Sequence, residues 1–296
     1  MFSLLILLLG GCSKTDSENV DNPNGESDAV SDDNSGDDPQ DTSFEINIDV
    51  SDLTNLPADT GGTHTPHPYG STEAFYGHYV YTPSGYQENG LEYPLLIFLH
   101  GWNPELGDLP LDHVLSGGPP MLIENGEWDP SFPFIVATPQ LLSQYWAPEH
   151  MHRFIEYLID TYRINTKRIY LTGLSLGGGG CWYYVGEVDD NYAAAIVPIS
   201  SAGAEYLVDN LKSVPIWAFH GQRDATVAFY DRFGSVQMVE AVNAANPNVR
   251  ARVTLYPNLG HDAWSNTYDN SGQFHYQTYD EFKVDIYDWM LSHKKE

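Results

Sequence analysis

A serine between two glycines is the stretch of this sequence whose residue types point most directly to chemistry. Gly173-x-Ser175-x-Gly177 is the pattern of a nucleophile elbow, a tight turn between a strand and a helix that exposes a serine hydroxyl. The backbone is crowded there, so the positions beside the serine favour glycine. Residues 168–172 are rich in β-branched and aromatic side chains, and residues 181–185 contain no proline. This strand–turn–helix context predicts that Ser175 is a nucleophile.

A serine hydroxyl becomes a useful nucleophile when a neighbouring base accepts its proton. His261 lies in a loop after the predicted strand at residues 249–256, and Asp224 follows the predicted strand at residues 215–219. An imidazole accepts a proton near neutral pH, and a carboxylate fixes its tautomer and stabilises the imidazolium. We therefore predict a catalytic triad of Ser175, Asp224 and His261.

Three other residues compete for the roles of carboxylate and base. Asp262 is adjacent to the histidine and would have to fold back on its ring, and Asp231 is a second rival carboxylate. His220 is the rival base, but it precedes the turn that carries Asp224, and we expect it to pack beneath that turn. The spacing favours Asp224 over both rivals.

A second glycine turn, His100-Gly101-Trp102, follows the continuous apolar run at residues 93–99. Glycine lets the backbone approach a ligand closely, so we predict that the backbone N–H groups of Trp102 and Leu176 form an oxyanion hole. Several rings flank the motif loops. They either stack on a sugar or phenolic acyl group or pack the loops onto the core. The candidate substrate-binding residues are His100, Trp146, Trp182 and Trp264, although His100 also fits a hydrogen-bonded structural role at a strand end.

The elements that must position these residues follow from the hydrophobic pattern. Short apolar runs alternate with helical patterns, which predicts an α/β fold with a mostly parallel central sheet and helices on both faces. In such sheets the site lies at the carboxyl ends of the strands. Short connections predict no large cap domain. The predicted strands span residues 75–83, 93–99, 134–137, 169–171, 194–197, 215–219 and 249–256, and the predicted helices lie at residues 149–162, within 224–245 and at 279–293.

The first 45 residues differ from the rest in composition. An apolar run ends at Gly10-Gly11-Cys12, is too short to span a bilayer, and resembles the signal sequence and lipobox of bacterial lipoproteins. That resemblance implies lipidation of Cys12. Residues 13–45 hold eleven acidic residues and one basic residue, which predicts a disordered tether, with loose calcium binding as the alternative. The expected organisation is a signal peptide at 1–12, a tether at 13–45 and one catalytic domain at 46–296.

Charge and cysteine content narrow the class of partner. The net charge is −28, and such a chain repels the phosphates that dominate nucleic-acid affinity, so no nucleic-acid partner is expected. Neutral esters or glycans suit it better than anionic polymers. If Cys12 is lipidated, Cys181 has no disulfide partner and is expected to pack in the core. His64-x-x-His67 lacks a supporting cluster of ligands, so no metal is expected.

Several segments together resemble the α/β-hydrolases described as predicted peptidases, a group related to polyhydroxybutyrate-depolymerase-like enzymes and to feruloyl and acetylxylan esterases. The order Ser, Asp, His along the chain is that of α/β-hydrolases. The resemblance covers about residues 75–291 and implies the α/β-hydrolase fold, the same triad, and ester cleavage without metal or cofactor. The run of four glycines at 177–180 departs from the pattern, because it weakens the start of a helix. The matching segments are residues 94–101, 117–120, 134–140, 169–179, 217–221 and 260–264.

These observations predict an exported serine esterase that is held to a bacterial membrane only through its N-terminal lipid, on the periplasmic side or at the cell surface. Its expected substrate is an acyl ester of a plant polysaccharide, feruloyl or acetyl, or a smaller ester. Two alternatives stay open: a serine peptidase of the prolyl-oligopeptidase type, and a catalytically inactive glycan-binding protein. The sequence does not determine the oligomeric state.

Overall fold

The computed structural model describes residues 49–103 and 109–296. The predicted signal peptide, the lipidation site at Cys12 and the acidic tether lie outside the described residues. In the part that is described, no helix combines the length and the apolar character that crossing a membrane requires.

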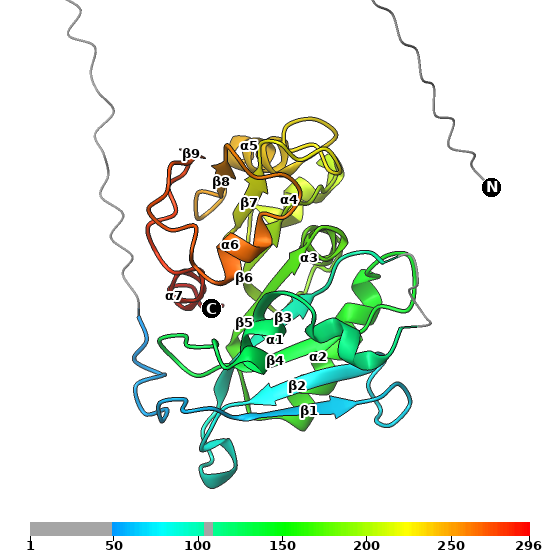
Figure 1. Cartoon of the computed structure of the whole chain (residues 1–296), viewed down its shortest axis with the longest axis vertical. Coiled ribbons are helices and arrows are strands. Elements are labelled where there is room, and N and C mark those ends of the chain that lie inside the picture. Colours follow the sequence, from blue (N-terminus) through cyan, green and yellow to red (C-terminus); the bar gives the residue numbers. More distant parts are fainter. Residues whose placement is uncertain (1–48, 104–108) are drawn as a thin grey trace, which may run out of the picture. The chain divides into compact units, whose positions relative to one another are not determined.

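A nine-stranded sheet runs through the centre of the described chain in the order β1-β2-β4-β3-β5-β6-β7-β8-β9 (Figure 1). The six strands from β4 to β8 in this order are parallel, while β1, β2 and β9 pair antiparallel at the two edges. The prediction of a mostly parallel sheet is confirmed. The strands are β1 (Thr63–His67), β2 (His78–Thr82), β3 (Tyr93–Leu99), β4 (Ile135–Pro139), β5 (Ile164–Leu174), β6 (Ala193–Ile199), β7 (Trp217–Gly221), β8 (Arg252–Tyr256) and β9 (Thr278–Tyr279).

Helices cover both faces of this sheet, as Figure 1 shows. On one face α3 contacts β3, β5 and β6, and α2 and α4 pack beside it. On the other face α1 contacts β3, β4 and α6, and α7 contacts β6. The helices are α1 (Gly118–Asn125), α2 (Pro148–Thr161), α3 (Leu176–Glu187), α4 (Val208–Leu211), α5 (Ser235–Ala244), α6 (Trp264–Tyr268) and α7 (Ile286–Leu291), with 3₁₀ turns at Tyr86–Glu88, Leu111–Leu115 and Glu205–Leu207.

The central strands are buried on both faces, which explains their unbroken apolar sequences. All seven residues of β3 are buried, and its side chains alternate between the two layers. Leu95, Ile97 and Leu99 belong to the core cluster that includes Trp182 of α3. Phe98 points the other way and packs edge-on against Tyr268 of α6, at 5.6 Å between ring centroids.

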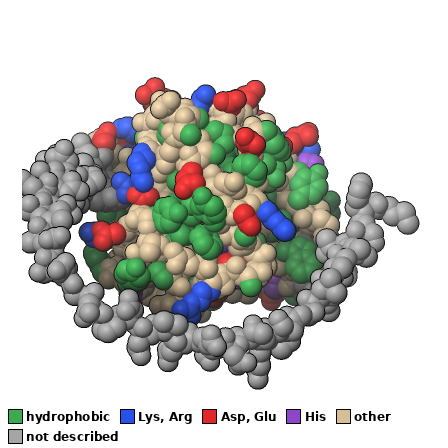
Figure 2. Space-filling model, turned by 90° about the horizontal axis from the view of Figure 1, so that it is seen from above, with side chains coloured by type: hydrophobic (Ala, Val, Ile, Leu, Met, Phe, Trp, Pro, Cys, Tyr) green, Lys and Arg blue, Asp and Glu red, His purple; other side chains and the backbone are tan. Residues whose placement is uncertain are grey.

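The surface carries charge of both signs but is acidic on balance. The whole chain has a net charge of −28, of which −10 lies in residues 13–45, so −18 remains for the rest. Figure 2 shows one face on which acidic and basic side chains surround separate clusters of hydrophobic side chains. This excess of carboxylates disfavours polyanionic ligands across the folded part of the chain.

Candidate active site

Ser175 occupies a strained turn between β5 and α3. Its backbone angles are φ 52° and ψ −117°, a conformation that residues other than glycine rarely adopt. The residues two positions before and after it have to be glycine because the turn is tight and lies against β3. A Cβ on Gly177 would lie 1.9 Å from the carbonyl oxygen of Leu99, and a Cβ on Gly173 would lie 2.5 Å from the carbonyl carbon of Gly177. The motif therefore forms the sharp turn that the sequence predicts.

The histidine and the aspartate come from the carboxyl ends of two further parallel strands. His261 follows β8 and Asp224 follows β7. His261 Nε2 lies 2.9 Å from Ser175 Oγ, and His261 Nδ1 lies 2.7 Å from Asp224 Oδ2. Because the carboxylate accepts a hydrogen bond at Nδ1, the proton of the neutral ring sits there and Nε2 is free to accept the serine proton. The structure thus brings the three predicted residues together in one hydrogen-bonded chain.

Asp224 is a buried carboxylate with four donors. Burial raises its pKa, but hydrogen bonds from His220, His261 and the backbone amides of Val227 and Thr226 outweigh that effect and hold the pKa well below its usual range. The amides of Thr226 and Val227 donate to Oδ1 at 2.8 and 2.9 Å. The carboxylate therefore stays ionised and is held in one orientation against His261.

His220, the rival base, contacts the same carboxylate. Its Nε2 lies 3.0 Å from Asp224 Oδ2 and 3.1 Å from the carbonyl oxygen of Val227, and its Nδ1 lies 2.8 Å from Ser235 Oγ. The ring is fully buried, as is Ser235. Sequence reasoning placed His220 beneath the turn but missed its contact with Asp224, although its position four residues earlier, at the end of a strand, was a signal for it.

Neither rival carboxylate is hydrogen-bonded to His261 in the described chain. Asp262 is exposed and accepts hydrogen bonds from the backbone amide and the hydroxyl of Ser265, at 3.0 and 2.9 Å. These bonds engage both oxygens of the Asp262 carboxylate with Ser265, and no hydrogen bond between Asp262 and His261 is present among the described residues. Asp231 is exposed in the loop before α5.

The two predicted oxyanion donors lie beside the nucleophile. A Cβ on Gly101 would lie 3.5 Å from the Cβ of Ser175, so the loop that carries Trp102 runs directly against the turn. Leu176 is the first residue of α3. In the described chain, neither the Trp102 amide nor the Leu176 amide donates a hydrogen bond to the protein. Both are therefore available to an oxygen that develops negative charge next to Ser175.

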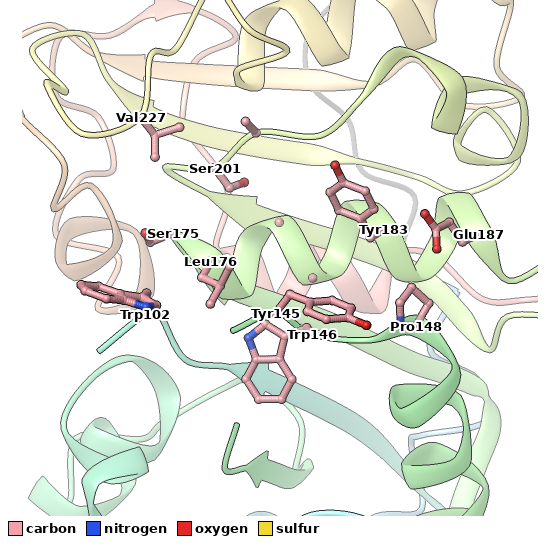
Figure 3. Close-up of a pocket in the computed structure, with 13 residues that line it drawn as sticks. Trp102, Tyr145, Trp146, Pro148, Ser175, Leu176, Tyr183, Glu187, Ser201 and Val227 are labelled. Atoms are coloured by element: carbon pink, nitrogen blue, oxygen red, sulfur yellow. The ribbon is translucent and has the colours of Figure 1, made fainter. Parts of the chain in front are cut away.

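A pocket of about 600 Å³ opens at Ser175 and extends along α3 (Figure 3). Figure 3 shows Ser175 and Trp102 at one end, and Tyr183 and Glu187 towards the other. Its walls are largely apolar and aromatic, with few polar groups, which is typical of sites for organic ligands. The other lining residues are Tyr145, Trp146, Pro148, Leu176, Gly179, Gly180, Ser201, Ala202 and Val227.

Among the candidate substrate-binding residues, Trp146 lies on the pocket wall and Trp264 packs edge-on against the triad histidine, at 5.2 Å between ring centroids. The structure does not support the other two. Trp182 is fully buried beneath α3, where its indole N–H donates to Ser201 Oγ at 3.1 Å. Bulky rings on the inner face of a helix pack in the core, so Trp182 has no access to substrate.

His100 has the structural role that was the alternative for it. Its Nδ1–H donates to the carbonyl oxygen of Gly101 at 2.8 Å, and its Nε2 accepts from the amide of Leu141 at 2.9 Å. Burial lowers its pKa to about 4, so the ring stays neutral at neutral pH. His100 fixes the turn that carries Trp102 and does not line the pocket.

The structure also places the two histidines of His64-x-x-His67. His64 Nδ1 lies 2.7 Å from Glu124 Oε1, and the ring of His67 stacks on that of His78, at 4.8 Å between centroids. Across residues 49–103 and 109–296, no three His, Cys, Asp or Glu side chains form a group suited to a metal ion.

Comparison with known proteins connects the chain to several solved structures. No family model and no curated protein matches it. A thermostable esterase matches with a TM-score of 0.54 and 23% identity over 79% of this chain, and the match spans 63% of the length of that esterase. The feruloyl esterase module of Clostridium thermocellum, in a complex with sinapinate, matches with a TM-score of 0.54 and 16% identity, over 82% of this chain and 91% of the module.

At these identities the likenesses concern the fold. Each match covers most of this chain, and the fold, a mostly parallel sheet with helices on both faces, is that of the α/β-hydrolases. The fold inferred from the resemblance is confirmed. Since this fold supports many chemistries, function has to be argued from the side chains of the site.

Proposed function

We propose that this α/β-hydrolase-fold protein is a serine-dependent carboxylic ester hydrolase that acts through an acyl-enzyme. The observation that carries the proposal is the unbroken chain of hydrogen bonds from Ser175 Oγ through His261 to Asp224, at 2.9 and 2.7 Å. These distances are already those needed for proton transfer from the hydroxyl to the imidazole. The chain ends at a pocket with two free amide donors.

In the proposed acylation step, Ser175 Oγ attacks the ester carbonyl while His261 Nε2 takes the hydroxyl proton. The carbonyl oxygen becomes an oxyanion, which accepts hydrogen bonds from the amides of Trp102 and Leu176. Asp224 stabilises the imidazolium without being protonated, since four donors keep its pKa low. The tetrahedral intermediate then breaks its bond to the alcohol oxygen, and that oxygen receives the proton from His261.

In the proposed deacylation step, a water molecule takes the place of the alcohol. His261 Nε2 removes a proton from the water as its oxygen attacks the acyl carbon, and the same two amides hold the second oxyanion. Collapse of this intermediate releases the carboxylic acid and returns the proton to Ser175. The proton that leaves Ser175 and later returns to it moves between Ser175 Oγ and His261 Nε2, which lie 2.9 Å apart.

We propose an acyl ester of a neutral plant polysaccharide as the substrate, with a feruloyl or acetyl group on the sugar. The pocket has room for more than a small ester, and its aromatic walls suit a sugar ring or a phenolic group. The net charge of the chain disfavours anionic polymers. The proposed export and lipidation at Cys12 would hold such an enzyme at the cell envelope, where large polymers are accessible.

The test of the function compares the wild-type protein with Ser175→Ala on p-nitrophenyl acetate, methyl ferulate, acetylated xylan and peptide anilides. We expect turnover of the esters and labelling by a fluorophosphonate in the wild type, and neither in Ser175→Ala. Asp262→Asn is the matched control, because Asp262 is adjacent to His261 but, among the described residues, its carboxylate accepts hydrogen bonds from Ser265 alone. This variant should retain turnover and labelling. Cleavage of anilides without esters would favour a peptidase, and no turnover with no labelling would favour a glycan-binding protein.

A further inference from the structure

Three of the four consecutive glycines in α3 are required by packing, and one is not. A Cβ on Gly177, Gly178 or Gly180 would lie 1.9, 2.6 or 2.9 Å from the nearest neighbouring atom. A Cβ on Gly179 would come no closer than 3.6 Å, to the carbonyl oxygen of Ala202, which is ordinary van der Waals contact. The backbone at Gly179 is helical and its φ is not positive, so alanine would fit there.

Glycine inside a helix is less favourable than alanine, so an open position like Gly179 requires another explanation. Gly179 lines the pocket at Ser175 and is partly exposed, whereas its neighbours Gly178 and Gly180 are buried. A side chain at Gly179 would occupy the space above the helix that the pocket now provides. Among the described residues none comes closer to this space than Ala202, so the missing side chain leaves room for a ligand.

The open face of α3 continues well beyond the nucleophile. Gly179, Tyr183 and Glu187 are spaced at four residues and lie on one side of the helix, and all three line the pocket. Glu187 lies twelve positions after Ser175, which corresponds to about 18 Å along the helix axis. A single acetyl or feruloyl group attached to Ser175 is shorter than this, so the acyl group alone does not fill the face.

A second hollow of about 570 Å³ adjoins the far end of the pocket. The two share Tyr145, Pro148 and Glu187, so they form one groove that starts at Ser175. The second hollow is more polar and more acidic than the first, and Arg153 is its basic residue. Its other lining residues are Ala147, Glu149, His152, Val188, Asp189 and Asp190.

We propose that this groove binds the neutral sugar chain that carries the ester, and that Gly179 is the specificity-determining residue that lets the chain lie across α3. The proposal rests on the proposed ester hydrolase function. The chain enters at the pocket beside Ser175, crosses the helix at Gly179 and reaches the polar hollow past Glu187.

The lining favours a hydroxyl-rich neutral chain over the other extended ligands. Near Ser175 the walls are aromatic, whereas beyond Glu187 they carry carboxylates. An alkyl chain would leave those carboxylates against apolar surface, and an anionic chain would be repelled by them. Sugar hydroxyls can donate to a carboxylate. Tyr206 donates to Glu187 Oε1 at 2.6 Å and holds this carboxylate at the junction of the two hollows.

The experiment compares Gly179→Ala and Gly179→Leu with the wild type on a small ester, p-nitrophenyl acetate, and on an acetylated xylo-oligosaccharide. The ratio of kcat/KM for the oligosaccharide to that for the small ester should fall about tenfold or more in Gly179→Leu, and less in Gly179→Ala. Gly179→Ala and Gly179→Leu should each lower Tm by less than the matched packing variant Gly180→Ala, whose new Cβ meets the side chain of Trp146. An unchanged ratio would overturn the proposal, as would a Tm loss in Gly179→Ala equal to that in Gly180→Ala.

A binding measurement separates this proposal from the proposed function. Ser175→Ala cannot form an acyl-enzyme, but it retains the groove, so calorimetric titration with unesterified xylohexaose should detect binding. The double variant Ser175→Ala/Gly179→Leu should bind at least about tenfold more weakly. Binding that is lost with the leucine supports the groove even if the wild type hydrolyses no ester. Equal affinity of the two variants, or no binding to either, would overturn it while leaving an active esterase intact.

Discussion

Two Ser–His pairs converge on one oxygen of Asp224, and only one of them opens onto the pocket. On the pocket side, Ser175 Oγ lies 2.9 Å from His261 Nε2, and His261 Nδ1 lies 2.7 Å from Asp224 Oδ2. On the buried side, Ser235 Oγ lies 2.8 Å from His220 Nδ1, and His220 Nε2 lies 3.0 Å from the same oxygen. The distances are nearly equal, so hydrogen bonding alone does not distinguish the two pairs.

The two pairs differ in the solvent exposure of the histidine and in the backbone conformation of the serine. The side chain of His261 is 23% exposed and that of His220 is fully buried. Ser175 sits at φ 52° beside two free amide donors, whereas Ser235 is a buried residue in the first turn of α5. A Ser–His–Asp arrangement becomes a candidate catalytic site only where substrate and an oxyanion hole can reach it. The buried pair positions the shared carboxylate.

Removing each serine hydroxyl in turn should give the largest difference between the two pairs. Ser175→Ala removes the nucleophile and should lower kcat for p-nitrophenyl acetate by about 10⁴-fold or more. Ser235→Ala removes one hydrogen bond to His220 and should change kcat by less than about tenfold. Steady-state kinetics, with a thermal melt to confirm folding, measures both. Equal losses in the two variants would mean that the buried pair takes part in the reaction directly.

Replacing His220 tests whether it positions Asp224, and the expected loss of kcat is smaller than in Ser175→Ala. His220→Phe removes a donor from a buried, ionised carboxylate, so kcat should fall by about 10- to 100-fold while KM stays close to the wild-type value. His220→Gln restores a donor and should recover part of the loss. A rise in KM at constant kcat would instead place His220 in substrate binding, and a failure of glutamine to recover any kcat would point to packing.

The sequence predicted the parts of the fold that are buried most completely. The apolar run predicted as a strand at 93–99 has the same bounds as β3. A strand that is covered on both faces is apolar throughout, so its ends are easy to locate in the sequence. The edges were missed. β1 is mostly exposed and contains Pro66, and β9 has only two residues. α1 begins at Gly118-Pro119-Pro120, a sequence that is typical of a turn. The helix packs against β3 and β4, and these contacts are not evident from the local sequence.

The same distinction holds for the site. The roles of Ser175, Asp224 and His261 follow from short motifs at strand ends, where topology brings distant segments together. The contact between His220 and Asp224 depends on the orientation of the His220 ring at the end of β7, which the four-residue spacing allows but does not determine. The burial of Trp182 and the openness at Gly179 depend on which face of α3 meets the sheet, and a run of glycines has no hydrophobic pattern to reveal it.

Acid should act on the buried histidines of the chain before it acts on Asp224. His78, His100 and His293 each have a pKa lowered to about 4, mainly by burial, against an ordinary value of 6.5. In the unfolded chain these histidines therefore become protonated below about pH 6.5, whereas in the native protein they stay neutral down to about pH 4. The free energy of unfolding should fall over this window, by up to about 1 kcal/mol per pH unit for each histidine.

Urea unfolding at pH 7, 6, 5 and 4.5 measures this slope. His100→Gln is the informative variant, because glutamine does not titrate and can still donate to Gly101 and accept from Leu141, as the ring does. Its slope between pH 6 and pH 4.5 should be smaller than that of the wild type, since one of the histidines with a lowered pKa is gone. A stability that does not change across the window would contradict the low pKa values.

The smallest expected effect concerns backbone strain, which distinguishes the two serines without any reaction. Ser175 has a positive φ, which glycine adopts without strain. The free energy of unfolding of Ser175→Gly should therefore be about 1 kcal/mol higher than that of Ser175→Ala. At Ser235 the backbone is helical, and there glycine should be less stable than alanine by about 0.5 kcal/mol. Urea unfolding of the four variants measures both differences. If the difference in stability between the glycine and the alanine variant were the same at Ser175 and at Ser235, the strain would not be specific to Ser175. Opposite signs would indicate that the chain tolerates strain at the serine that meets substrate and builds the buried pair from relaxed backbone.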